Sequence, residues 1–253
     1  MLQTIRTLLN LPCRYNSNMG WRCLGLCILL ATATRAQTPA PVLVELFTSE
    51  GCSDCPPADR LLARLDGQAI VLSEHVDYWN QLGWKDPFSS ALFSRRQESF
   101  CAELGAKGPY TPQMVVDGET EFVGSDAGRA SAAIAKAARQ PKAQVTLNRT
   151  AAGLDLQIAS SPGGGDVWLA LADDRDVSEV GAGENRGRRL EHVAVVRSLR
   201  KLGSVKRGGS YTHLLELPAG AGQRVVVFVQ QPAQGKILGA AMWSGGGSVS
   251  GSQ

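Results

Sequence analysis

The chain has 253 residues, of which 43% are hydrophobic and 19% charged, and its formal net charge is +3. These proportions are typical of a folded globular protein and exclude a mostly disordered chain. The small net charge argues against nucleic acid or an anionic membrane as the main partner. The length suffices for two modest domains or one large one.

Residues 1–36 have the pattern of a signal peptide or leader. No acidic residue precedes Glu45, several arginines do, and residues 24–30 form a short apolar run before Ala31-Thr32-Ala33. A basic flank, such a run and a small-x-small site are typical of secretion, and a bilayer span takes about 20 apolar residues. The alternative is an arginine-rich organellar presequence. We expect a periplasmic or secreted protein without a stable membrane span after cleavage.

Removal of the leader would leave three of the six cysteines, namely Cys52, Cys55 and Cys101. Disulfides persist in oxidising compartments, but three cysteines are too few for a small disulfide-stapled scaffold. The close pair is therefore a redox switch, a metal clip or a structural staple.

The mature chain opens with the pattern of a βαβ unit. Residues 42–48 form a near-continuous apolar run, typical of a strand buried on both faces. Apolar residues at helical spacing follow from Ala58 to Leu65, and residues 69–78 resemble a second strand. This order implies parallel strands joined by a right-handed crossover.

The pattern then continues with helices and a hairpin. A helix is expected near residues 89–104, after an aromatic loop. Asp117-Gly118 between two β-rich runs predicts a two-residue hairpin turn. An alanine-rich helix follows at about residues 127–138.

Beyond Pro141 the sequence changes to short β-rich runs separated by glycine-rich stretches. Such runs predict a sandwich or a small barrel, and residues 246–253 have a low-complexity composition typical of a disordered tail. The expected strands cover residues 145–148, 154–158, 167–171, 193–196, 211–217, 225–230 and 237–242.

The spacing of Cys52 and Cys55 at a strand-to-helix junction is typical of a thiol–disulfide site. A helix N-terminus favours a thiolate, and the second sulfur lies close enough to attack a mixed disulfide. Because Pro56 and Pro57 follow directly, we expect the regular helix to begin near Cys55. Asp54 opposes the thiolate, so we expect a reduction potential nearer thioredoxin, about −270 mV, than strong oxidants, about −120 mV.

Long motifs sharpen this interpretation. FTSEGCSDCPPAD, HVDYW with LGWKD, YTPQMVVDG and GENRGR resemble an exported bacterial family of the thioredoxin superfamily, labelled only as a domain of unknown function (DUF1223 type). The matches extend from about Leu43 to Ala241. The resemblance implies an α/β fold, with a thioredoxin-like domain at residues 40–140 and a smaller all-β, sandwich-like domain at residues 141–245. It also implies a cis proline at Pro112, facing the cysteines and shaping the substrate groove.

Glu45 is the fourth candidate site residue. Thioredoxins carry a buried acid on the strand before the cysteines, and Glu45 lies on the matching strand. Burial disfavours the charged form of a carboxyl group, which suits a group that passes protons to the second cysteine. The alternative is a glutamate that faces water or forms an ion pair.

The predicted function is thiol–disulfide exchange on protein or small-thiol disulfides, without an organic cofactor and with an unknown redox partner. Cys52 would attack and Cys55 would resolve. One alternative is a non-catalytic binding or scaffold protein with a structural disulfide, and another is a copper(I) carrier that uses both thiolates. Zinc is disfavoured because no second ligand pair accompanies the cysteines, even with His75 and Asp77 nearby. Cys101, on a helical stripe, is either a buried inert thiol or a resolving partner.

Overall fold

The computed structural model describes residues 40–216 and 222–245. The predicted leader and the predicted disordered tail lie outside these residues. Within them the chain forms eleven strands, three α-helices and one short 3₁₀ helix, η1 (Asn80–Leu82). The α-helices are α1 (Pro56–Leu65), α2 (Ala91–Leu104) and α3 (Ala127–Ala137).

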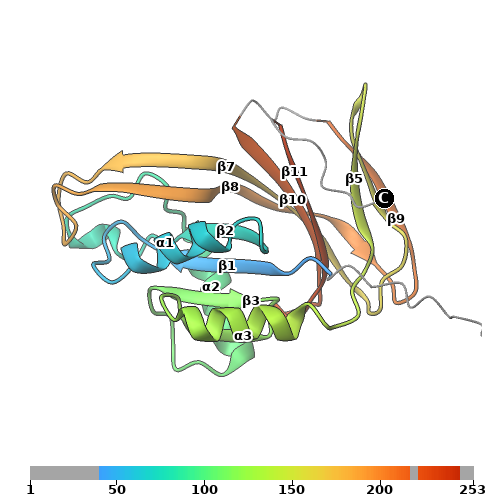
Figure 1. The fold of residues 1–253 in the computed structure, drawn as a ribbon, viewed down its shortest axis with the longest axis horizontal. Helices are drawn as coiled ribbons and strands as arrows, with labels where there is room; N and C mark the ends of the chain where they lie inside the picture. The colour runs from blue at the N-terminus through green and yellow to red at the C-terminus, as the bar shows by residue number, and fades with distance from the viewer. Residues whose placement is uncertain (1–39, 217–221, 246–253) are drawn as a thin grey trace, which may run out of the picture. The chain divides into compact units, whose positions relative to one another are not determined.

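The first part of the chain contains the predicted βαβ unit and hairpin (Figure 1). The first two strands are parallel, in register from Leu43↔Ile70 to Thr48↔His75. A turn is present at Asp117 and Gly118, where both residues have positive φ, 50° and 67°, as in a type I′ turn. Val116 pairs with Thr120, so the connection has three residues and not the predicted two. The strands are β1 (Leu43–Thr48), β2 (Ile70–His75), β3 (Gln113–Val116) and β4 (Thr120–Val123).

The helices cover opposite faces of these strands. The side chains of Val44 and Leu46 pack with the apolar stripe of α1 and with the alanines of α3. Phe47, which points to the other face because strand residues alternate, packs with Phe100 of α2. Each face of β1 is therefore buried, and every residue of the strand is inaccessible to solvent, which accounts for its near-continuous apolar sequence.

The second part of the chain supplies seven strands to two sheets. Three of them form a separate antiparallel sheet, and the other four extend the sheet that contains β1. The smaller sheet has the order β5 (Val145–Thr150), β6 (Gly153–Ile158), β9 (Tyr211–Leu215). The added strands of the main sheet are β7 (Gly165–Glu179), β8 (Arg189–Val205), β10 (Gln223–Gln230) and β11 (Ile237–Ser244).

The predicted fold class, an α/β thioredoxin-like domain followed by a smaller all-β domain, is wrong. The protein is mostly β, and one eight-stranded sheet runs in the order β11-β10-β7-β8-β2-β1-β3-β4. β8 pairs with β2 in parallel at Ser73↔Val195 and so covers the edge that β2 would otherwise leave unpaired. Periodicity identified the strands but carries no information on which strands pair. The residue boundaries 40–140 and 141–245 stay a prediction.

The smaller sheet packs against the added strands. Side chains of β5, β6 and β9 form one apolar cluster with side chains of β7, β10 and β11. The predicted smaller, sandwich-like all-β domain is therefore wrong as well, because one of the two packed layers belongs to the main sheet. Among the described residues, no helix has the length and apolar character needed to cross a membrane.

Candidate redox site

The two cysteines connect the end of β1 to the start of α1. Cys52 and Cys55 form a disulfide, with their Cα atoms 5.4 Å apart. The Cys55 N–H donates to the Cys52 carbonyl oxygen at 3.3 Å and closes the turn. Cys55 is the N-cap of α1, and Pro56 and Pro57 occupy its first positions, where amides lack partners within the helix. The prediction that the regular helix begins near Cys55 is confirmed, and the disulfide lies at its positive end.

Pro112 lies beside this helix start. The Thr111–Pro112 peptide bond is cis, as predicted. A Cβ atom on Gly124 would lie 3.2 Å from the Cβ atoms of both Pro112 and Ala58. Since Ala58 comes three residues after Cys55, the proline is next to the first turn of α1.

Trp79 provides a second link between the proline segment and the cysteine loop. Its Nε1–H donates to the Thr111 hydroxyl oxygen at 2.8 Å. Its Cβ atom would lie 3.0 Å from a Cβ atom on Gly51, the residue before Cys52. The absence of a side chain at Gly51 therefore lets the indole approach the loop.

Neither sulfur is open to solvent in this conformation. Cys52 is 1% exposed and Cys55 0%, whereas Ser53 and Asp54 between them are exposed. Disulfide exchange requires in-line access to one sulfur by an attacking thiolate. The residues that shield Cys52 from solvent therefore control whether an attacking thiolate can reach it.

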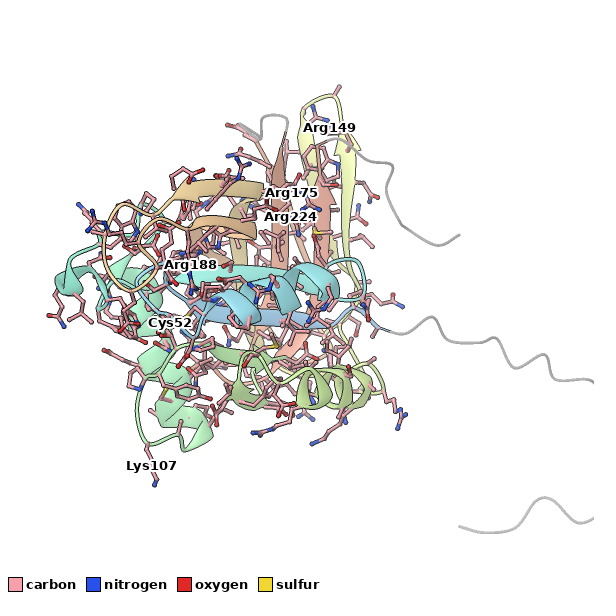
Figure 2. All side chains as sticks on the ribbon, turned by 60° about the vertical axis from the view of Figure 1, so that its left-hand side comes forward. Cys52, Lys107, Arg149, Arg175, Arg188 and Arg224 are labelled. Carbon is pink, nitrogen blue, oxygen red and sulfur yellow. A yellow bond between two sulfur atoms is a disulfide. The ribbon has the colours of Figure 1, made fainter. Side chains whose placement is uncertain are left out.

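Part of the cover comes from the connection between β7 and β8. Asn185, fully buried, donates from its side-chain amide to the carbonyl oxygens of Glu50 and Cys52, both at 2.8 Å. Glu184 accepts a hydrogen bond from the Ser53 N–H at 3.0 Å. Arg188 donates to the Asn185 Oδ1 atom at 2.9 Å, and Figure 2 shows Arg188 at the same end of the sheet as Cys52. A segment more than 130 residues away thus holds the cysteine loop.

Glu50 joins this connection to the rest of the site. The residue is fully buried, and its N–H donates to Asp86 Oδ2 at 2.9 Å. Its carboxylate accepts from Trp84 Nε1 at 2.8 Å and from the hydroxyl group of Ser178. The same carboxylate lies 3.3 Å from His192 Nε2. Buried polar groups require such partners. Glu50 therefore holds the cysteine loop in place through contacts with four residues.

Two histidines and two further carboxylates lie next to Glu50. His75 Nδ1 is 2.7 Å from Asp86 Oδ2, and the rings of His75 and His192 meet edge to face at 4.8 Å. His192 Nδ1 lies 3.9 Å from Asp59 Oδ2. Asp59, one turn after Cys55, accepts a hydrogen bond from the Thr48 hydroxyl at 2.9 Å. We call Glu50, Asp59, His75, Asp86 and His192 the buried acid–histidine cluster.

The cluster separates the proton affinities of its members. Burial raises the pKa of Asp59, and the neighbouring charge of His192 offsets only part of the effect. Burial also disfavours ionised Glu50, but hydrogen bonds from His192, Ser178 and Trp84 bring its pKa below the ordinary value. Burial opposes the charge on His192, yet the hydrogen bond to Glu50 and the charge of Asp59 raise its pKa. The same surroundings therefore shift the pKa values of Asp59 and Glu50 in opposite directions.

Residues 43–230 match the family described as "Protein of unknown function (DUF1223)". The chain belongs to the DUF1223 family. No curated protein matches the chain.

Two solved structures resemble this DUF1223 protein. One is protein AGR_C_4864 from Agrobacterium tumefaciens, with 26% sequence identity and a TM-score of 0.73, covering 86% of this chain and 100% of that one. The other is HBP35 of Porphyromonas gingivalis, with 17% identity and a TM-score of 0.53, covering 85% of this chain and 79% of that one. The second likeness concerns the fold alone.

The structure does not bring Glu45 to the cysteines. Glu45 lies three residues before Thr48 on β1, so its side chain points to the opposite face. There Arg96 of α2 donates to Glu45 Oε1 at 2.7 Å and lies 3.5 Å from Glu74 Oε1. This is the ion-pair alternative considered from the sequence, and all three side chains are buried.

His75, Asp77 and Cys101, which the sequence suggested less strongly as site residues, have the following surroundings. Asp77 accepts a hydrogen bond from the Ser94 hydroxyl at 2.5 Å, and His75 belongs to the buried acid–histidine cluster. Cys101 is a buried free thiol, and burial raises its pKa. In residues 40–216 and 222–245 no three His, Cys, Asp or Glu side chains converge so as to hold a metal ion.

Sequence reasoning missed Asp59, Asn185 and His192 as site residues. Asp59 carried a signal, because a carboxyl group four residues after Cys55 falls on the same helical face as the cysteine. Asn185 lies in the GENRGR motif, which supported the resemblance without suggesting a role. His192 carried no signal, since its place depends on the pairing of β8 with β2.

Proposed function

We propose that this protein is an exported thiol–disulfide oxidoreductase that acts on protein or small-thiol disulfides, with Cys52 as the attacking and Cys55 as the resolving residue. The observation that carries the proposal is the Cys52–Cys55 disulfide at the N-terminus of α1, next to cis Pro112. Export is supported by the leader pattern and by the disulfide, which persists in oxidising compartments.

The chemistry follows from the helix start. The positive end of the α1 dipole favours negative charge on the sulfurs after reduction. The backbone adds no free donor there, because Pro56 and Pro57 carry no N–H and the N–H groups of Ala58 and Asp59 both donate to the Cys55 carbonyl oxygen. Pro112, beside the first turn of α1, has no N–H and therefore adds no backbone donor there. We propose on this basis that the site is related to those of the thioredoxin superfamily, although β7, β8, β10 and β11 extend the sheet beyond β2.

Access to Cys52 has to be created for exchange to occur. The residue is 1% exposed, and the hydrogen bonds from Asn185 and Glu184 hold its loop. Both groups belong to the connection between β7 and β8, which lies between Glu179 and Arg189. We propose that this connection moves aside when a substrate disulfide or a reducing thiol binds.

The burial of Cys52 and Cys55 also supports a second candidate function, that of a binding or scaffold protein with a structural disulfide. A disulfide with both sulfurs covered stabilises a loop without taking part in exchange, and the protein would then be a binding or scaffold protein. Structural disulfides have reduction potentials below about −300 mV and exchange slowly. Potential and rate therefore distinguish the two functions.

The test is catalysis of insulin reduction by dithiothreitol, together with the redox equilibrium of the protein with glutathione. We expect catalysis that Cys52→Ser abolishes, a trapped mixed disulfide in Cys55→Ser, and unchanged catalysis in Cys101→Ser as the matched control. An uncatalysed background rate combined with a potential below about −300 mV would establish the structural disulfide instead. Copper(I) binding by the reduced protein, lost in Cys52→Ser, would support the carrier alternative.

A further inference from the structure

Asp59 is a buried carboxyl-bearing residue of α1 that follows Cys55, the proposed resolving residue. The backbone N–H of Asp59 donates to the Cys55 carbonyl oxygen at 3.1 Å, so the two residues are one turn apart on α1. Side chains at this spacing share a helical face, with Cβ atoms about 5–6 Å apart. Cys55, Asp59 and Leu62 form a buried stripe on α1, whereas Pro57 and Arg60 are exposed.

We propose that Asp59 accepts the proton of the Cys55 thiol, and that His192, held by Glu50, is the positioning residue that balances the charge on Asp59. This inference rests on the proposed function and names the proton path of the same site. It differs from the sequence prediction, in which Glu45 has that role, because Arg96 binds Glu45 on the opposite face of β1.

A substrate disulfide accepts electrons from the reduced pair, and Cys52 is first joined to one substrate sulfur. The Cys55 thiol gives its proton to the Asp59 carboxylate, and the Cys55 thiolate attacks the Cys52 sulfur. The new Cys52–Cys55 bond forms, the bond to the substrate breaks, and its electron pair leaves on the substrate thiolate. Asp59 then passes its proton toward that thiolate or solvent.

The surroundings of Asp59 fit this role. His192 Nδ1, 3.9 Å from Asp59 Oδ2, has no hydrogen-bond partner among the described residues, although its side chain is 1% exposed. Its other nitrogen faces Glu50. Burial raises the pKa of Asp59, which makes the carboxylate a better proton acceptor than an exposed one. An unpartnered nitrogen aimed at Asp59 can take up a hydrogen bond when the carboxylate is ionised.

Charged and polar groups from several elements act on Asp59. They are Thr48 of β1, His75 of β2, Asp86 of the segment before α2, and His192 of β8. Two further carboxylates face His192 instead, Glu50 at 3.3 Å and Asp176 on the paired position of β7.

The first experiment is the equilibrium of the Cys52–Cys55 disulfide with glutathione, measured from pH 5 to pH 9. It needs no catalysis, so it tests this inference even if the proposed function fails. We expect an inflection from Asp59 that disappears in Asp59→Asn. In His192→Gln the inflection moves to higher pH, because the positive charge that favours ionised Asp59 is gone. A general loss of structure would not shift the inflection in this direction.

The second experiment is the rate at which a preformed mixed disulfide on Cys52 is resolved. General base catalysis contributes about 10²–10⁴-fold, and we expect Asp59→Asn to slow resolution by about 100-fold, with partial rescue in Asp59→Glu. Glu98→Gln is the control, because it removes an exposed carboxylate of α2 and should retain the inflection and the rate within about threefold. An unchanged inflection and rate in Asp59→Asn would overturn the inference.

Discussion

The side-chain amide of Asn185 donates to the carbonyl oxygen of Cys52 at 2.8 Å, across 133 residues of sequence. Through this contact the second half of the chain completes the cysteine site of the first half. The site therefore depends on the connection between β7 and β8 as much as on the CxxC motif.

Replacing Asn185 by Ala should loosen the loop that carries Cys52. The change leaves the buried carbonyl oxygens of Glu50 and Cys52 without their donor, and an unsatisfied buried group costs about 1–3 kcal/mol. Chemical denaturation of the oxidised protein should show this loss. Dithiothreitol should also reduce the disulfide several-fold faster. Asn148→Ala, on an exposed position of β5, is the control, and equal reduction rates in the two variants would contradict the proposed cover.

Gly124→Ala should disturb the contact between Pro112 and α1. The added Cβ atom would lie 2.7 Å from Leu46 Cδ1 and 3.2 Å from Pro112 Cβ. Overpacking of this kind costs about 1–3 kcal/mol, measurable by thermal unfolding. At Gly128 an added Cβ atom would contact only Asp126 Oδ1, at 3.5 Å, so Gly128→Ala should be neutral or slightly stabilising. Equal effects of the two substitutions would show that the packing around Pro112 is looser than described.

Arg96→Met should destabilise the protein strongly at pH 7. Arg96 is the buried cation between Glu45 and Glu74, and removal of one partner from a buried ion pair costs about 3–5 kcal/mol. Urea denaturation of this variant and of Arg95→Met, which changes an exposed neighbour, measures the difference. A cost below about 1 kcal/mol, the range of surface pairs, would refute the buried pairing.

Glu74→Gln should remove a pH dependence of stability. Burial, and then the charge of Glu45, raise the pKa of Glu74 well above 4.5 in the folded protein. The folded state therefore holds a proton that the unfolded state loses above about pH 4.5, and stability falls as pH rises toward the folded pKa, by at most about 1.4 kcal/mol per pH unit.

The measurement is denaturation at several pH values from 4 to 9. Glu74→Gln should gain stability relative to the native protein as pH rises, and show no such gain at pH 4. Glu98→Gln, at an exposed position of α2, should follow the native curve. Parallel curves for the native protein and Glu74→Gln would mean that Glu74 does not retain its proton on folding.

Local sequence patterns predicted most helices and strands, and they predicted the part of the site that consists of Cys52, Cys55 and Pro112. Helical spacing from Ala58 to Leu65, the Asp117-Gly118 turn and the β-rich runs after Pro141 each predicted an element that the structure contains. The start of α1 at the cysteine pair follows from Pro56 and Pro57, because proline restricts its own and the preceding backbone.

Only the tertiary structure determined which strands pair and which side chains meet in the site. Alternation in a strand specifies which side chains are buried, but not which strand lies alongside, so nothing local to β8 predicted its pairing with β2 or the arrival of His192 next to Asp59. For Glu45 the apolar run correctly predicted burial, whereas its role depended on the face that Arg96 occupies. Burial is a property of the local pattern, while the charge that compensates a buried group comes from wherever the folded chain places it.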